Sequence, residues 1–209
     1  YYQDDQGRNI KIAYADGSST QTVYSQDNRI AAVIDELGVE TRYTYDVNGN
    51  ILTQTRADGA VTSYTYNELN LPLTASDYAG NTWEFTYDEL GNMLSMTDSL
   101  GNSVQNEYDE LSRMTKQIDA NGNQTVYQYD GPVITAMTDA AGNKYTFTYD
   151  SMYRMLTRTD PLGHKELYGY DKKGRKLQET ARDGGVTSYE FSPAGTVLSM
   201  TDPMGAKST

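Results

Sequence analysis

The chain has 209 residues, of which 37% are apolar, and carries a net charge of −12 at pH 7. This acidity argues against a nucleic-acid partner, which would require clustered Lys and Arg to neutralise phosphates. The absence of Cys excludes disulfides and thiolate metal sites. The sequence has no signal peptide and no apolar run long enough to span a bilayer, so we expect no membrane insertion.

Glycines recur along the chain at a fixed spacing, and an aromatic residue follows nearly every one after seven residues. The glycines lie 21 residues apart, with one step of 20 after the sixth: Gly17, Gly38, Gly59, Gly80, Gly101, Gly122, Gly142, Gly163, Gly184 and Gly205. The aromatic residues are Tyr24, Tyr45, Tyr66, Tyr87, Tyr108, Tyr129, Tyr149, Tyr170 and Phe191. Self-similarity at a fixed period indicates a repeat protein. We therefore expect residues 1–209 to form a single array of about ten units of 21 residues, truncated at both ends. Because the chain begins and ends inside a unit, we expect it to be an internal segment of a longer protein.

Each unit contains two predicted turns, and the unit that begins at Tyr87 is typical. Asp88 and Gly91 bracket its first turn, and Asp98 and Gly101 bracket the second. Asp at the first turn position and Gly at the fourth indicate a type I turn followed by a left-handed residue. This pattern predicts three-residue hairpin loops, and the turn aspartates account for much of the acidity.

Two short strands separate the turns. The strand before each regularly spaced aromatic residue alternates with period two, as in Trp83, Phe85 and Tyr87, which predicts a half-buried strand. The second strand is less regular, because apolar doublets such as Met93-Leu94 place apolar residues on both faces. No segment has helical periodicity. We predict an all-β array of antiparallel hairpins with about twenty strands, and a sheet of this width should be strongly curved.

The repeat length predicts one irregularity per unit. If both loops have three residues, the pairing register slips by one residue in each unit of 21, and successive tyrosines would alternate faces. An extra unpaired residue, such as a bulge, would keep them on one face and bend the sheet. Equivalent tyrosines would then stand two strands apart, at about 10 Å. The expected row is Tyr45, Tyr66, Tyr87, Tyr108, Tyr129, Tyr149 and Tyr170.

Several positions depart from the regular pattern. The segment Asp130-Gly131-Pro132 lacks one residue, so we expect a distorted turn there. Asn70, Ser112 and Tyr153 replace the first-turn glycine. Asn tolerates the left-handed conformation, whereas Tyr153 should be strained or refolded.

The pattern Tyr-Asp-x-x-Gly, a second Asp-x-x-Gly and then x-Tyr-x-Tyr-Asp resembles the YD repeat of the rearrangement-hotspot (Rhs) family. Residues 43–50 and 85–92 carry the pattern most clearly, and it recurs at 147–150 and 169–175. The resemblance covers essentially the whole chain.

The resemblance implies a segment of a hollow β-shell in a larger secreted or surface protein of a bacterium. In bacterial polymorphic toxins and toxin-complex components, such a shell encloses a C-terminal toxin, and related arrays occur in wall-associated proteins and animal teneurins. The partners implied are the remainder of the same polypeptide and its C-terminal cargo. Toxin forms also carry a self-cleaving aspartyl protease centre. Residues 202–205 resemble part of its motif, but 160–163 do so equally well, and we interpret both as ordinary Pro-containing turns.

The residues themselves do not indicate an enzyme, and we expect no catalytic residue, cofactor or metal site. The only histidine, His164, follows a turn glycine without a Gly-x-Ser-x-Gly elbow, so we interpret it as a solvated loop residue. The loops at 46–50 and 119–123 resemble half a calcium loop but lack the terminal Glu. Turn stabilisation is the preferred interpretation, with adventitious cation binding left open.

An adhesive binding module is the alternative to the shell segment. Aromatic rows can stack on sugar rings, and Trp83, the only Trp, lies at the outer end of an aromatic stripe. The partner would then be a glycan or a surface receptor. Because an isolated segment of sheet has unpaired edges, we also expect it to dimerise edge to edge.

Overall fold

The computed structural model describes all 209 residues. They form 21 β-strands and no helix, as the sequence predicts, so there is also no helix that could cross a membrane. The chain divides into two compact units, Tyr1–Asn106 and Glu107–Thr209. The two units contain the same kind of hairpin.

The strands are short, and most have five or six residues. The first eleven are β1 (Tyr2–Gln3), β2 (Asn9–Ala13), β3 (Ser19–Tyr24), β4 (Ile30–Ile34), β5 (Glu40–Tyr45), β6 (Ile51–Arg56), β7 (Val61–Tyr66), β8 (Pro72–Ser76), β9 (Thr82–Tyr87), β10 (Met93–Asp98) and β11 (Ser103–Tyr108). The remaining ten are β12 (Met114–Ile118), β13 (Gln124–Asp130), β14 (Val133–Thr138), β15 (Lys144–Tyr149), β16 (Met155–Thr159), β17 (Lys165–Tyr170), β18 (Lys176–Thr180), β19 (Val186–Phe191), β20 (Val197–Thr201) and β21 (Lys207–Ser208).

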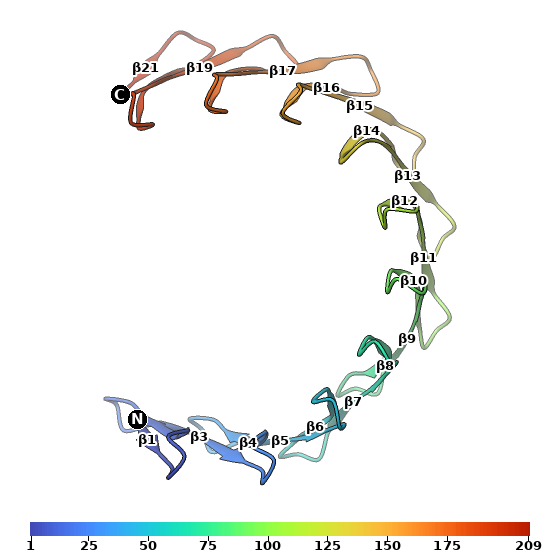
Figure 1. Cartoon of the computed structure of the whole chain (residues 1–209), viewed down its shortest axis with the longest axis vertical. Helices are drawn as coiled ribbons and strands as arrows, with labels where there is room; N and C mark the ends of the chain where they lie inside the picture. The colour runs from blue at the N-terminus through green and yellow to red at the C-terminus, as the bar shows by residue number, and fades with distance from the viewer. The chain divides into compact units, whose positions relative to one another are not determined.

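Within each unit the strands form an antiparallel meander, in which each strand pairs with its neighbours in sequence. For example, β5 pairs with β6, and β6 pairs with β7. The ribbon of each unit bends along its length (Figure 1).

The turns have the predicted three-residue loops. At the turn after β10, the Asp98 amide donates to the Asn102 carbonyl at 2.9 Å, and the Gly101 amide donates to the Asp98 carbonyl at 3.0 Å. Gly101 has a φ of 85°, which is the left-handed conformation that favours glycine. The same pair of backbone hydrogen bonds recurs at turn after turn in both units.

The predicted irregularity is present once per repeat, and it is a bulge in the strand that follows the aromatic residue. Thr44 pairs with Thr53 and Tyr45 pairs with Ile51, so Leu52 has no partner. The equivalent unpaired residues are Ala31, Leu73, Leu94, Thr135, Leu156, Leu177 and Leu198. The other hairpin of each repeat has no register shift, as between β6 and β7. One extra residue in each repeat therefore keeps the tyrosines on one face, as the register argument requires.

Each unit is a single layer with almost no conventional core. Only Ala32 and Ala136 are buried apolar residues, and no large side chain is fully buried. Threonine and serine hydroxyls pair across strands, as between Thr44 and Thr53 at 2.6 Å and between Thr148 and Thr157 at 2.7 Å. Because no second layer covers either face, backbone ladders and cross-strand side-chain pairs hold the sheet together.

The shortened turn at Gly131 and the turn at Tyr153 depart from the regular turn in different ways. At the shortened turn, Asp130 pairs directly with Val133, and Gly131 and Pro132 form a two-residue loop. The turn is therefore tighter rather than distorted, since a positive φ of 53° at Gly131 before Pro132 fits a type II′ hairpin. Tyr153 keeps the ordinary turn, with its amide 3.0 Å from the Asp150 carbonyl, and adopts a φ of 59°. It is thus strained rather than refolded, whereas Asn70 and Ser112 take the left-handed conformation at smaller cost.

Candidate functional site

The turn aspartates form hydrogen bonds within their own loops, as the sequence predicts. In the turn after β9, the Asp88 carboxylate accepts hydrogen bonds from the Leu90 and Asn92 amides at 3.0 and 2.8 Å. The Asn92 side-chain amide donates to its other oxygen at 2.8 Å. These bonds, the side-chain bond first, hold the pKa of Asp88 below its usual value. Asp88 therefore stays ionised because its carboxylate accepts hydrogen bonds inside its own turn.

Five of the regularly spaced tyrosines bond to the repeat before their own: Tyr24, Tyr45, Tyr66, Tyr129 and Tyr149. The Tyr45 hydroxyl donates to the Ile30 carbonyl at 2.8 Å, and the Tyr149 hydroxyl donates to the Ile134 carbonyl at 2.9 Å. Each acceptor is the residue that pairs with the preceding aromatic residue, directly beside the bulge. Burial raises the pKa of Tyr149, so its hydroxyl keeps the proton that it donates. The row is thus part of the packing between repeats.

Five arginines occupy the position directly after the left-handed residue of first turns, and we call them the turn arginines. They are Arg8, Arg29, Arg113, Arg154 and Arg175. Each guanidinium lies over the regularly spaced aromatic ring of the following repeat, at 4.4 to 5.6 Å from the ring centroid. This distance is within the range of a cation–π contact.

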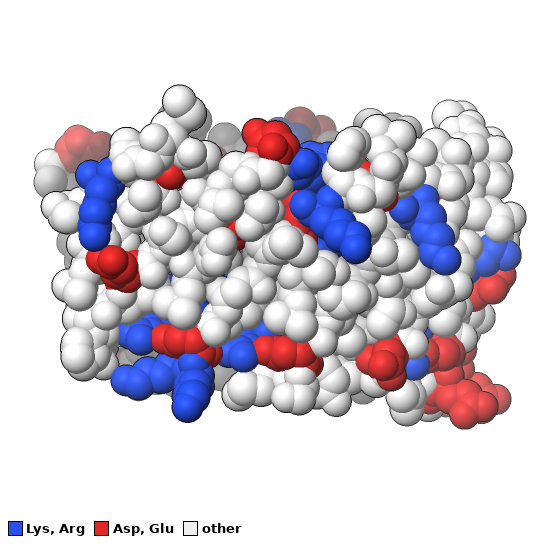
Figure 2. Space-filling view, turned by 90° about the horizontal axis from the view of Figure 1, so that it is seen from above, with Lys and Arg blue, Asp and Glu red and all other residues white.

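The turn arginines also connect neighbouring turns. Arg154 Nη2 lies 2.6 Å from Asp150 Oδ2, and its Nη1 donates to the Asp171 carbonyl of the next repeat at 2.8 Å. Arg175 makes the same contacts with Asp171 and the Ser192 carbonyl. The side-chain bond from Arg154 is the main cause of the lowered pKa of Asp150. On the face in Figure 2, basic and acidic side chains lie next to one another rather than in separate patches.

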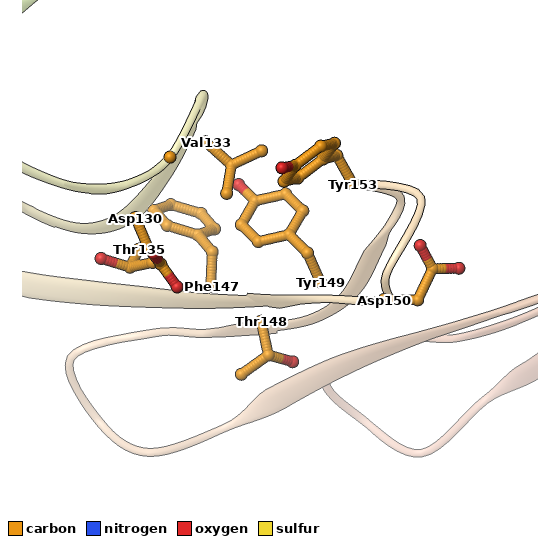
Figure 3. Close-up of a pocket in the computed structure, with 9 residues that line it drawn as sticks. Asp130, Val133, Thr135, Phe147, Thr148, Tyr149, Asp150 and Tyr153 are labelled. Carbon is orange, nitrogen blue, oxygen red and sulfur yellow. The ribbon is translucent and has the colours of Figure 1, made fainter.

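A cavity of about 400 Å³ opens beside the shortened turn in the second unit. Phe147, Tyr149 and Tyr153 supply aromatic rings, and Val133 and Asp130 also line the cavity. Figure 3 shows Phe147 and Tyr149 on one side of β15, with Val133 and Tyr153 beside Tyr149 and Thr148 on the opposite side. A Cβ at Gly131 would lie 3.7 Å from the Tyr153 hydroxyl, so Tyr153 packs close to the shortened turn. The shortened turn and Tyr153, two of the irregular positions in the sequence, are thus next to each other in space.

His164 takes a structural place in its turn. Its Nδ1 lies 3.0 Å from Asp160 Oδ2, where Asn123 and Asn143 make the equivalent contact with their own turn aspartates. Burial alone would raise the pKa of Asp160, but the hydrogen bonds from His164 lower it overall. The geometry gives His164 the turn-stabilising role of the asparagines.

Trp83 and the loop at 46–50, considered from the sequence for sugar and cation binding, also make contacts within the sheet and its turns. Trp83 is half-buried in β9 and pairs with Ala75 and Asp98. The Asp46 carboxylate accepts hydrogen bonds from the main-chain and side-chain amides of Asn50, each at 2.8 Å. These contacts favour structural roles at both positions.

Sequence reasoning missed the turn arginines and the cavity. The arginine positions follow the same spacing as the tyrosines, so their alignment within the repeat is the signal that could have revealed them. The cavity follows from the same alignment. Val133 has the same separation in sequence from Tyr149 that Arg113 has from Tyr129, so a valine stands where an arginine would.

Comparisons with known proteins agree with the fold. The chain is similar to a chain of the Photorhabdus luminescens Tc holotoxin pore structure, with a TM-score of 0.60 and 13% identity over 90% of this chain. It spans only 13% of the length of that toxin chain. Similarity to the crystal structure of TcdB2-TccC3 without its hypervariable C-terminal region is weaker, with a TM-score of 0.42 and 14% identity over 96% of this chain and 16% of the other. No curated protein matches the sequence.

A sequence profile described as RHS Repeat matches residues 24–61, 45–77, 66–103 and 134–165. These matches together span more than half of the 209 residues. They include the tyrosines, turn aspartates and bulges that define the geometry of both units. The chain belongs to the RHS Repeat family.

Proposed function

We propose that residues 1–209 are one continuous array that forms part of the wall of a shell, and that this shell encloses or presents the C-terminal part of the same polypeptide. The observation that supports this most is the single-layer sheet, which buries only two apolar side chains and leaves two broad faces open. A sheet of this kind suits a wall between two compartments better than a self-contained domain. The fold similarity to a chain of the Tc holotoxin pore is consistent with such a wall.

Limited proteolysis of the complete polypeptide tests the proposal. The C-terminal segment should resist a broad-specificity protease in the native polypeptide and be digested when it is expressed without the repeats. Digestion at the same rate in both contexts would contradict enclosure. A denatured sample of the complete polypeptide serves as the control for cleavable sites.

The proposal assigns no catalytic role, cofactor or metal to this segment. Its support is the use of the reactive side chains within turns, as for His164 on Asp160. A bacterial protein that is secreted or held at the cell surface or wall fits the proposed shell. Fractionation of the source cells, with antibodies against the repeats, tests that location.

The adhesive module is less favoured, because the tyrosine hydroxyls bond to the backbone and Trp83 is half-buried. A glycan array would decide this point. Strong binding that is lost in Trp83→Ala would favour adhesion over the shell.

An isolated segment should pair through its terminal strands. The outermost strands, β1 and β21, have only two residues each, and each has one strand partner in its unit. Concentration-dependent dimerisation in light scattering is expected. A strict monomer at high concentration would contradict edge pairing.

A further inference from the structure

The cavity beside the shortened turn occupies the place that a turn arginine fills elsewhere. Arg113 covers the ring of Tyr129 at 4.6 Å, and Arg154 covers the ring of Tyr170 at 4.9 Å. Val133 has the corresponding position in sequence relative to Tyr149. The Tyr149 ring therefore has no guanidinium over it, although the rest of its setting is preserved, including the hydroxyl bond to Ile134.

The acceptors that serve a turn arginine also remain at this place. In a regular repeat the guanidinium bonds to the aspartate that begins its own turn and to the carbonyl that begins the next turn. The equivalents here are the Asp130 carboxylate and the Asp150 carbonyl, and both residues line the cavity. The regular turn aspartates bond to their own loops, whereas Asp130 pairs across a two-residue loop and is exposed. Asp130 and Asp150 thus line a cavity whose tyrosine ring has no guanidinium over it.

Tyr153 completes the enclosure and has a conformation that favours glycine. Its φ of 59° is unusual for a bulky residue. At the same turn position in the next repeat, Gly174 has a φ of 85°. Strained residues of this kind persist only where their surroundings fix them. Here the side chain lies against Gly131 and forms one aromatic wall of the cavity.

We infer that this cavity binds an arginine side chain presented by another polypeptide segment. A planar guanidinium stacks on aromatic rings and bonds to a carboxylate and a carbonyl at once, which a compact ammonium does less well. The protein itself places a guanidinium over five other rings. Among these arginines, Arg154 and Arg175 also bond to a carboxylate and to a main-chain carbonyl. The inference does not depend on the proposed shell, because it concerns only residues 130–153 of the second unit.

The test uses the 209-residue chain and two small probes, acetyl-arginine methylamide and its neutral counterpart acetyl-citrulline methylamide. Titrations followed by NMR should show saturable shifts of Tyr149 and Tyr153 with the arginine probe. The citrulline probe should bind at least about tenfold more weakly, because it lacks the charge that strengthens hydrogen bonds and ring stacking. Equal responses to the two probes would overturn the inference.

Three variants sharpen the test. Val133→Arg should place a guanidinium over Tyr149 and abolish probe binding, and Asp130→Asn should weaken binding at least about fivefold by removing the charged acceptor. Asp5→Asn, at an exposed acid in the first unit, is the matched control and should bind as the parent does. Unchanged binding in Asp130→Asn, with a parent-like NMR spectrum, would overturn the inference even if Val133→Arg failed to fold.

Discussion

The turns at 130–133 and 150–154 begin with the same residue type and follow the same strand pattern, but they differ in how they contact the next repeat. At 150–154 the aspartate bonds to its own loop and to Arg154, and Arg154 bonds to the turn that follows. At 130–133 the loop has two residues, and no arginine follows it. The tyrosine contact is present beside both turns. The comparison separates two kinds of connection between repeats. In one, a tyrosine hydroxyl bonds to a strand carbonyl of the preceding repeat, and in the other, a turn arginine bonds to the turn of the next repeat.

Of the changes that test this comparison, loss of a turn arginine should lower the stability of the protein most. Arg154→Ala removes the charged bond to the Asp171 carbonyl and the stacking on Tyr170. We expect it to lower the free energy of unfolding by about 2 kcal/mol. Urea denaturation followed by circular dichroism measures the change. Lys172→Ala, at an exposed position in the next turn, is the control, and an equal loss there would refute a specific role for Arg154.

Loss of the tyrosine contact should lower the free energy of unfolding by about half as much as loss of a turn arginine. Tyr129→Phe removes the hydroxyl that donates to the Met114 carbonyl at 2.8 Å while it keeps the ring under Arg113. The expected loss is about 1 kcal/mol in the same denaturation experiment. Phe191 shows that the array tolerates a phenylalanine at this position. Tyr127→Phe, two residues earlier on the same strand, should change stability by less than about 0.5 kcal/mol.

Acid should weaken the regular turn through its aspartate. The pKa of Asp150 is lower in the folded protein than its ordinary value of 3.8, chiefly because Arg154 bonds to the ionised form. A lowered pKa stabilises the fold above the unfolded pKa, and this contribution disappears as the pH falls through the folded value. Asp150→Asn should therefore be less stable than the parent at pH 7, and the difference should shrink below about pH 4. A difference that stays constant from pH 7 to pH 3 would show that the charge of Asp150 is unimportant.

Relief of strain at the turn glycine position should give the smallest effect. Tyr153→Gly removes a tyrosine from the left-handed conformation. It also increases the conformational entropy of the unfolded chain and removes the packing against Gly131. We expect a net gain of less than about 1 kcal/mol. The opposite change, Gly174→Ala, places a side chain at a φ of 85° and should destabilise the protein by about 1 kcal/mol. Thermal melts of the two variants should therefore shift in opposite directions, and shifts in the same direction would contradict the strain argument.

Much of the fold could be predicted from the sequence because it depends on local signals. Asp98 and Gly101 specify their loop through hydrogen bonds within five residues, and the alternation of Trp83, Phe85 and Tyr87 specifies a strand face. The bulge could be predicted from the odd repeat length, but its position could not. The apolar doublets mark it in hindsight, since Leu94 and Leu156 are the residues left without a partner.

The candidate site was harder to predict because its contacts connect residues about one repeat apart. Tyr149 bonds to Ile134, and Arg154 reaches Asp171, only after the bulge has set the register between the hairpins. Arginine also stands at the turn position in only some repeats, while Asn50, Leu71 and Asn92 take it in others. The cavity depends on a further step, the presence of Val133 in a series where arginine is frequent.

The bulge beside each aromatic residue has a consequence for how such arrays grow. Because every repeat restores its own pairing register, a whole repeat can be duplicated or removed and the flanking repeats still pair with each other. A single-residue deletion inside a strand has no such correction and would turn the following side chains to the wrong face. The deletion at Gly131 falls in a loop, where a shorter hairpin absorbs it and Tyr149 keeps its place in the row. The array should therefore tolerate the gain or loss of whole repeats, and it should tolerate single-residue losses only at its turns.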